Sequence, residues 1–227
     1  MFRQIDAALW VLDKPFAMLG LQIGGRMTVC RLQDGSLLVH SPVRTTPEER
    51  AALTAIGPVR HIVAPNLMHH LFVADMKSAF PEARVYVAPG LPQKLKTLRY
   101  DEVLGDTAPA AWAGQIEQHV VGGMPGLNEV VFFVKASRAL MVTDLVFNFT
   151  SVNSTWEKLF WTLNGALGGV RVTRVLRSTI KDRAMCKASI ERILSWDFDR
   201  ITLCHGEVLP SGGRDALRQA YGFLLNS

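Results

Sequence analysis

The stretch Arg60–Pro89 constrains the fold of this chain most, because it places a strand, a turn, a helix and another strand in immediate succession. Its apolar run Ile62–Ala64 is typical of a short buried strand, and a turn containing proline follows it. The adjacent histidines His69 and His70 stand where helical spacing begins, and Val85–Ala88 indicates the next strand. The residues at helical spacing are Leu71, Phe72, Met76, Ala79 and Phe80. These patterns predict an α/β unit whose helix carries imidazoles at its start.

Further patterns extend this unit into a layered fold. The β-rich runs Met27–Leu32 and Ser36–His40 flank an Asp-Gly turn, which is a hairpin signal. Thr46 is typical of a helix N-cap, and that helix ends at Gly57. Other expected strands are Leu9–Leu12, Gln115–Val121, Glu129–Val134, Ala139–Thr143 and Ile201–Cys204. Other expected helices are Leu91–Thr97, Ser151–Leu167, Ala184–Leu194 and Arg214–Leu225. This order predicts one α/β sandwich domain covering residues 1–227.

The composition excludes several classes of protein. With 227 residues, 48% hydrophobic and 20% charged, the chain can bury one sizeable core. Its net charge of +5 is spread along the sequence, so we expect no nucleic-acid partner. The three cysteines form no CxxC pair, which fits a reducing compartment. The N-terminus does not read as a signal peptide and no apolar run could span a bilayer, so we expect a cytoplasmic protein without a membrane partner. The sequence does not determine the oligomeric state.

Several side chains that can bind metal follow apolar strand runs directly. His40, Asp144 and His205 each come at the end of such a run, and the pair His69-His70 follows one across a turn. Strand ends deliver side chains to a shared cleft. Imidazole and carboxylate donors together suit a zinc-like cation. Each histidine taken alone is better explained by a structural hydrogen bond, whereas for the set together spacing leaves both interpretations open.

Four segments carry these residues in an order that resembles the metallo-β-lactamase superfamily, and more closely a branch of it with unknown function. The segments are GRMTVCRLQDGSLLVHSPV (Gly25–Val43), Ile62–His70, Asn128–Asn148 and Trp196–Leu209. Together they span nearly the whole chain. The resemblance implies an αββα four-layer sandwich with its site at the strand ends.

The resemblance also implies that one of the superfamily's two metal positions is missing. The motif His-x-His-x-Asp-His falls on Pro65–His70, with Pro65 and Leu67 where two histidines would stand. A Thr-Pro-Gly-His turn corresponds to Met124–Leu127, with Leu127 in place of the histidine. These three substitutions remove the protein ligands of the first position.

The second metal position keeps residues that can all coordinate. Its ligands correspond to His69 in place of an aspartate, His70, Asp144 and His205. A register shifted by one residue would instead put His70 at the aspartate position. We expect at most one divalent metal there, zinc before manganese or iron, and leave open that none binds. An open shell would yield a bound water with a pKa of about 7, whose proton Asp144 could take, whereas four protein ligands would close the shell.

Other residues carry weaker signals. His40 replaces an aspartate that braces the ligands in the superfamily, so it is either a partner of the site or a structural residue. Glu129 follows the altered third motif, where the pattern favours an exposed turn residue, with a side chain that reaches the cleft as the alternative. Asn66 is a candidate for positioning substrate. Trp156 and its apolar neighbours at helical spacing predict core packing, with a lid over the site as the alternative.

The expected function is therefore a metal-dependent hydrolase acting on a small ester, amide, lactone or phosphate. The alternative is a catalytically silent member of the fold that serves as a binding or scaffold module. Survival of His70, Asp144 and His205 favours the enzyme, and loss of the first metal position favours the silent protein. Redox chemistry would need that first position as well.

Overall fold

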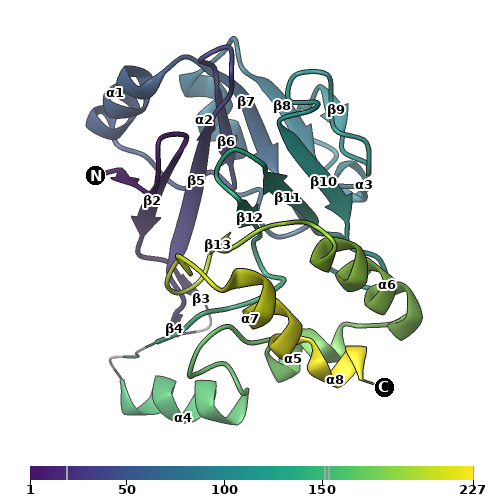
Figure 1. Cartoon of the computed structure of the whole chain (residues 1–227). Coiled ribbons are helices and arrows are strands. Elements are labelled where there is room, and N and C mark those ends of the chain that lie inside the picture. The colour runs from purple at the N-terminus through teal and green to yellow at the C-terminus, as the bar shows by residue number, and fades with distance from the viewer. Residues whose placement is uncertain (19, 151, 153, 227) are drawn as a thin grey trace.

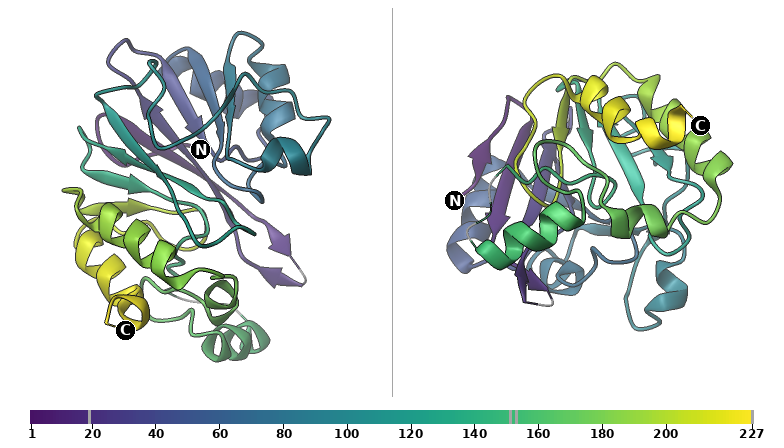
Figure 2. Two further views of the ribbon diagram at one scale, coloured as in Figure 1. Left: turned by 90° about the vertical axis from the view of Figure 1, so that its right-hand side faces the viewer. Right: turned by 90° about the horizontal axis from the view of Figure 1, so that it is seen from below.

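A large and a small β-sheet pack face to face at the centre of the computed structural model, and helices cover their outer sides (Figure 1). The structure describes residues 1–18, 20–150, 152 and 154–226. Within these residues the large sheet has seven strands in the order β1-β2-β5-β6-β7-β8-β9, and the small sheet has four in the order β10-β11-β12-β13. Figure 2 shows the same sequence of layers from two further sides. The arrangement confirms the predicted αββα sandwich.

The large sheet is built around the predicted hairpin. β5 (Gly25–Arg31) and β6 (Leu37–His40) pair antiparallel, and β7 (Val59–Ala64) and β8 (Arg84–Val87) continue the sheet in parallel. Helices α1 (Pro47–Ile56) and α2 (Val73–Ala79) connect the parallel strands. The remaining elements of this half are β1 (Arg3–Gln4), β2 (Leu9–Lys14), α3 (Leu91–Lys94) and β9 (Glu102–Val103).

The start of α1 shows how closely local sequence fixes this half. The hydroxyl of Thr46 accepts the N–H of Glu49 at 3.3 Å, and the Glu49 carboxylate accepts the N–H of Thr46 at 2.9 Å. This capping box satisfies helix N–H groups that would otherwise lack partners. Leu53 is fully buried on the inner side of the helix. The predicted cap at Thr46 and the predicted end at Gly57 are both confirmed.

The small sheet carries the second half of the chain. β12 and β13 pair in parallel, and the other neighbours are antiparallel. Its strands are β10 (Ile116–Val120), β11 (Val130–Val134), β12 (Ala139–Met141) and β13 (Arg200–Thr202). Its helices are α4 (Thr155–Leu163), α5 (Arg174–Ser178), α6 (Arg183–Leu194), α7 (Gly213–Ala220) and α8 (Gly222–Leu225).

Burial on both faces explains why strand β6 is continuously apolar. Leu38 joins the core between the two sheets, where it belongs to the same cluster as Phe132 and Met141. Val39 points the other way into the core beneath α1 and α2. Alternate residues of one strand thus serve two cores. The chain leaves this doubly packed layer at His40, where side chains can enter a cleft.

Four expected helices differ from the structure. Helix α3 ends at Lys94 and not at Thr97. Helix α2 begins at Val73, so His69 and His70 lie in the preceding turns and not at its start. The closing segment divides into α7 and α8. Helix α4 is shorter than Ser151–Leu167, whose residues 151 and 153 lie outside the described residues.

The prediction that Trp156 packs in the core was also wrong. The ring is exposed, as are Leu159 and Leu163, while Glu157 and Trp161 form the buried side of α4. Sequence periodicity locates an apolar stripe on a helix but does not say which stripe the rest of the fold will cover. In the described residues, no helix is both long and apolar enough to cross a membrane.

Candidate metal centre

Two histidines and one aspartate converge at the strand ends. The Nε2 atom of His69 lies 3.2 Å from Oδ2 of Asp144, and the Nε2 atom of His205 lies 3.2 Å from Oδ1 of the same carboxylate. His69 comes from the turn after β7, Asp144 follows β12, and His205 follows β13. One potential ligand atom from each lies within 4.8 Å of the others. These three are the predicted residues that the fold brings together.

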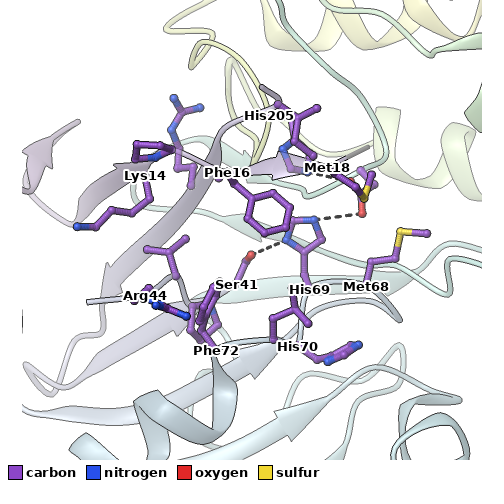
Figure 3. Close-up of a pocket in the computed structure, with 18 of the residues that line it drawn as sticks. Lys14, Phe16, Met18, Ser41, Arg44, Met68, His69, His70, Phe72 and His205 are labelled. Carbon is purple, nitrogen blue, oxygen red and sulfur yellow. Dashed lines mark hydrogen bonds and ion pairs between the residues drawn. The ribbon is translucent and has the colours of Figure 1, made fainter. Parts of the chain in front are cut away.

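The outer nitrogens of both imidazoles are already engaged. Nδ1 of His205 lies 2.8 Å from the carbonyl oxygen of Gly24, so Nδ1 carries the proton and donates it. The hydroxyl of Ser41 lies 2.7 Å from Nδ1 of His69 (Figure 3). In a neutral His205, Nε2 then turns its lone pair toward a carboxylate. That arrangement is repulsive unless a proton or a metal cation lies between the two groups.

The carboxylate of Asp144 is fixed from behind by buried polar groups. The Asn66 amide donates to Oδ2 of Asp144 at 2.7 Å, and Glu129 accepts the backbone N–H groups of Asp144 at 2.9 Å and Thr143 at 2.6 Å. Asn66 also receives the backbone N–H of His69 at 2.7 Å. One asparagine therefore sets the positions of two candidate ligands at once. Such bracing fixes the orientation of metal ligands in proteins.

The buried Arg26 holds the loop that carries His205. The Nη1 atom of Arg26 donates to the carbonyl oxygens of Leu203 at 2.9 Å and Gly206 at 2.6 Å. The Nε atom of Arg26 pairs with Asp13 at 2.5 Å. The imidazole of His205 also stacks on Phe147, with ring centroids 5.6 Å apart. The loop is thus anchored from both sides.

Electrostatics in this cluster favour a charged carboxylate. Burial alone would raise the pKa of Asp144, but His69 and the hydrogen bond from His205 hold that pKa well below its usual value. Burial lowers the pKa of His69, but the Asp144 carboxylate outweighs burial and holds that pKa well above its usual value. In Glu129, burial and the nearby Asp144 charge raise the pKa to about 7. A cation among the three donors would replace the proton that His69 otherwise keeps.

An apolar cavity of about 330 Å³ opens onto this cluster. Its lining includes Phe16, Met18, Val43, Met68 and Phe72 together with the two imidazoles and Asp144 (Figure 3). Cations also line the cavity, among them Arg44 and Lys94. A site with convergent polar groups at the base of an apolar pocket is the usual form of a small-molecule site.

A family model described as a domain of unknown function, DUF4336, matches residues 6–160, which is more than half of the chain. The chain belongs to the DUF4336 family. A comparison with curated proteins gave no match.

Solved metallo-β-lactamases share the fold of this DUF4336 chain. One from Pontibacter korlensis has a TM-score of 0.69 at 13% identity, covering 100% of this chain and 99% of that one. One from Pseudomonas aeruginosa in a mono-zinc form has a TM-score of 0.67 at 12% identity, covering 100% and 93%. One from Erythrobacter litoralis has a TM-score of 0.70 at 12% identity, covering 99% and 95%. Identities this low establish a common fold and nothing about activity.

In the DUF4336 chain, the residues that the resemblance places at the first metal position form backbone hydrogen bonds or pack in the core. Leu127 is buried, and its carbonyl oxygen accepts the N–H of Leu67 at 3.0 Å. The carbonyl of Pro65 accepts the N–H of Val130 at 2.8 Å. Leu67 packs against the core beneath α2. The side chains of Leu67 and Leu127 have no donor atom that could bind a metal at that position.

Two predicted residues lie near the donor group without joining it. His70 lines the cavity and points away from His69 (Figure 3). Burial and Lys94 lower its pKa, so it is neutral near pH 7. His40 is fully buried, and neither of its ring nitrogens has a hydrogen-bond partner among the residues that the structure describes. Its ring meets Phe132 edge-on, with centroids 5.3 Å apart. Burial lowers the pKa of His40 to about 3.

Sequence reasoning missed several residues that hold the site. Glu129 was read as an exposed turn residue, yet it is fully buried and brackets the end of β12. The sequence patterns predicted no role for Arg26 or Ser41. A charged residue inside the apolar strand of Arg26 was the available signal, because an arginine is rarely buried without several acceptors. For Ser41, with φ of 54°, no sequence signal exists.

Proposed function

We propose that this DUF4336 protein is a metal-dependent hydrolase holding one divalent ion between His69, Asp144 and His205. The observation that carries the proposal is the convergence of two Nε2 atoms on the two oxygens of one carboxylate, with both Nδ1 atoms already engaged. Two imidazoles and a carboxylate are a donor set that zinc accepts, and manganese or iron are the alternatives.

Three protein donors leave a coordination position for water or substrate, which is the pattern of catalytic zinc sites. The sequence suggested a fourth ligand, His70, that would have closed the shell. Because His70 lines the cavity and points away from His69, it would contact the substrate and not the metal. When bound, an ion here supplies a Lewis acid and lowers the pKa of a coordinated water toward neutrality.

The protein's own groups orient the reactants. The low pKa of Asp144 keeps it ionised, so it serves as a metal donor and accepts a hydrogen bond that orients the attacking water. Asn66 prevents the carboxylate from turning away. The neutral His70 imidazole in the cavity wall can hydrogen-bond to the substrate in either sense.

The cavity favours a small substrate with an apolar body. Phe16, Val43 and Phe72 contribute apolar surface, whereas Arg44 and Lys94 would attract a negative group. A small ester, amide, lactone or phosphate meets these conditions, and each has an oxygen that a cation can polarise.

A catalytically silent binding module is the second candidate. It is favoured by the burial of Leu127 and the packing of Leu67 at the first metal position. In that case the apolar cavity would bind its ligand without turning it over.

The decisive experiment measures bound metal in protein purified without chelator and then loaded separately with zinc, manganese or iron. We expect one equivalent in the wild type and in His70→Ala, and less than about a tenth in His205→Ala, because only His205 belongs to the donor group. The rate of hydrolysis of a panel of esters, lactones and phosphoesters should rise with the metal content of the sample. Absence of stoichiometric metal under all loading conditions would refute the hydrolase. Stoichiometric metal without turnover of any panel member would favour the binding module.

A further inference from the structure

Helix α4 presents an apolar face to solvent. Trp156, Leu159 and Leu163 are 61%, 52% and 59% exposed. Their spacing of three and four residues places them on one side of the helix. Single exposed apolar residues are ordinary, but an aligned tryptophan and two leucines are the mark of a contact surface.

The fold holds this face outward. On the opposite side of α4, Trp161 is buried and packs on Phe149 with ring centroids 4.6 Å apart. The carboxylate of Glu157 accepts the backbone N–H of Gln22 at 2.7 Å. These contacts tie α4 to the β3–β4 hairpin, where β3 is Ala17–Met18 and β4 is Leu21–Gln22. The helix cannot roll its apolar side inward without breaking them.

Exposed basic residues lie beside the apolar face. Between residues 145 and 181 the sequence has five basic residues and a single acid, Glu157, which is buried. Lys158 on α4 and Arg174 on α5 are exposed, and Val175 beside Arg174 is also exposed. Viewed from below, α4 and α5 lie on the same side of the molecule (Figure 2, right).

We propose that the α4–α5 face, defined by Trp156, Leu159, Leu163, Lys158 and Arg174, binds peripherally to the surface of an anionic lipid bilayer. A bilayer offers apolar depth for the leucines and an interface that suits a tryptophan ring. Its anionic headgroups complement the exposed Lys158 and Arg174. A second copy of this chain fits less well, because a symmetric contact would bring like charges together.

This contact also has a defined relation to the cavity. The buried side of α4 packs in one cluster with Ile23 and Phe16 of the hairpin segment, and those residues line the cavity. Met18 in the same hairpin is exposed at the cavity wall. A bilayer on the α4–α5 face would therefore lie next to the wall of the pocket. The expectation of no membrane partner rested on the lack of an apolar run that could span a bilayer, which a peripheral contact does not need.

Tryptophan fluorescence gives a direct test. The chain has five tryptophans, and the other four, Trp10, Trp112, Trp161 and Trp196, are buried. Quenching by brominated acyl chains therefore reports Trp156. With vesicles of mixed phosphatidylglycerol and phosphatidylcholine we expect co-sedimentation, a blue shift and quenching. Binding should weaken about fivefold for each of Lys158→Gln and Arg174→Gln, and should weaken with added salt.

Matched variants separate the surface from the fold. Trp156→Phe should still sediment with vesicles but lose the quenching, whereas Trp156→Ser combined with Leu159→Ser should lose sedimentation by at least tenfold. Tyr100→Ser removes another exposed aromatic side chain, after α3, and should not change vesicle binding. The side chains of Trp156, Leu159 and Tyr100 are all exposed, so unchanged circular dichroism and thermal midpoints are expected for each variant.

Three results would overturn the proposal. The first is no binding to phosphatidylglycerol vesicles at low salt. The second is binding that survives Trp156→Ser with Leu159→Ser. The third is a dimer in sedimentation velocity that this double variant dissociates, which would assign the face to a second copy of the chain. None of these measurements depends on metal or on hydrolysis.

Discussion

Replacing Asn66 with alanine tests whether the site is held together as the hydrogen bonds indicate. The Asn66 side chain is fully buried. It donates to Asp144 at 2.7 Å and to the Thr143 hydroxyl at 2.9 Å, and it accepts the N–H groups of Met68 at 2.8 Å and His69 at 2.7 Å. Alanine would leave two backbone donors and one charged acceptor without these partners.

The magnitude follows from those losses. Each buried donor left without a partner costs about 1–3 kcal/mol, and a hydrogen bond to a charged group contributes roughly 1.5–3 kcal/mol. Water entering the space left by the amide offsets part of this, so we expect Asn66→Ala to lower the free energy of unfolding by about 3–5 kcal/mol. In a domain of this size that corresponds to a fall of roughly 6–20 °C in the thermal midpoint.

Denaturant unfolding of the metal-free protein, followed by circular dichroism, provides the measurement. Asn164→Ala is the matched control, because that amide donates one hydrogen bond, to the carbonyl oxygen of Phe160 at 3.0 Å, and is only partly buried. It should cost less than about 1 kcal/mol. If Asn66→Ala were no more destabilising than Asn164→Ala, the inferred network around Asp144 would be wrong.

Two further predictions concern the anchoring loop and pH. Arg26→Lys cannot reach both carbonyls of the Leu203–Gly206 loop while pairing with Asp13, so we expect roughly tenfold weaker zinc binding in competition with a chromophoric chelator, and no change for Arg31→Lys. In chelator-treated protein the raised pKa of His69 contributes stability that is complete below its unfolded value of 6.5 and is lost as pH rises through the folded pKa. The wild type should therefore lose stability as the pH rises above about 6.5 in urea unfolding, and His69→Gln should flatten that slope. An equal slope in both proteins would contradict the assignment.

Sequence alone determined the elements and the identity of the candidate donors. The Asp-Gly hairpin, the Thr46 cap and the apolar runs of β7 and β11 are set by neighbours in the chain, because turns, caps and burial patterns depend on local residue types. The same reasoning placed Asp144 and His205 at strand ends, since the polar residue that follows a buried run marks where the strand leaves the core.

Tertiary structure decided what those residues do. His69 joins the donor group and His70 does not, although the two are adjacent, because a turn between β7 and α2 sends their side chains in different directions. Trp156 is exposed because packing against the β3–β4 hairpin selected the opposite side of its helix. Glu129 reaches Asp144 only because β11 and β12 pair in one register. Side-chain direction and long-range pairing depend on segments far apart in the chain, so local patterns do not determine them.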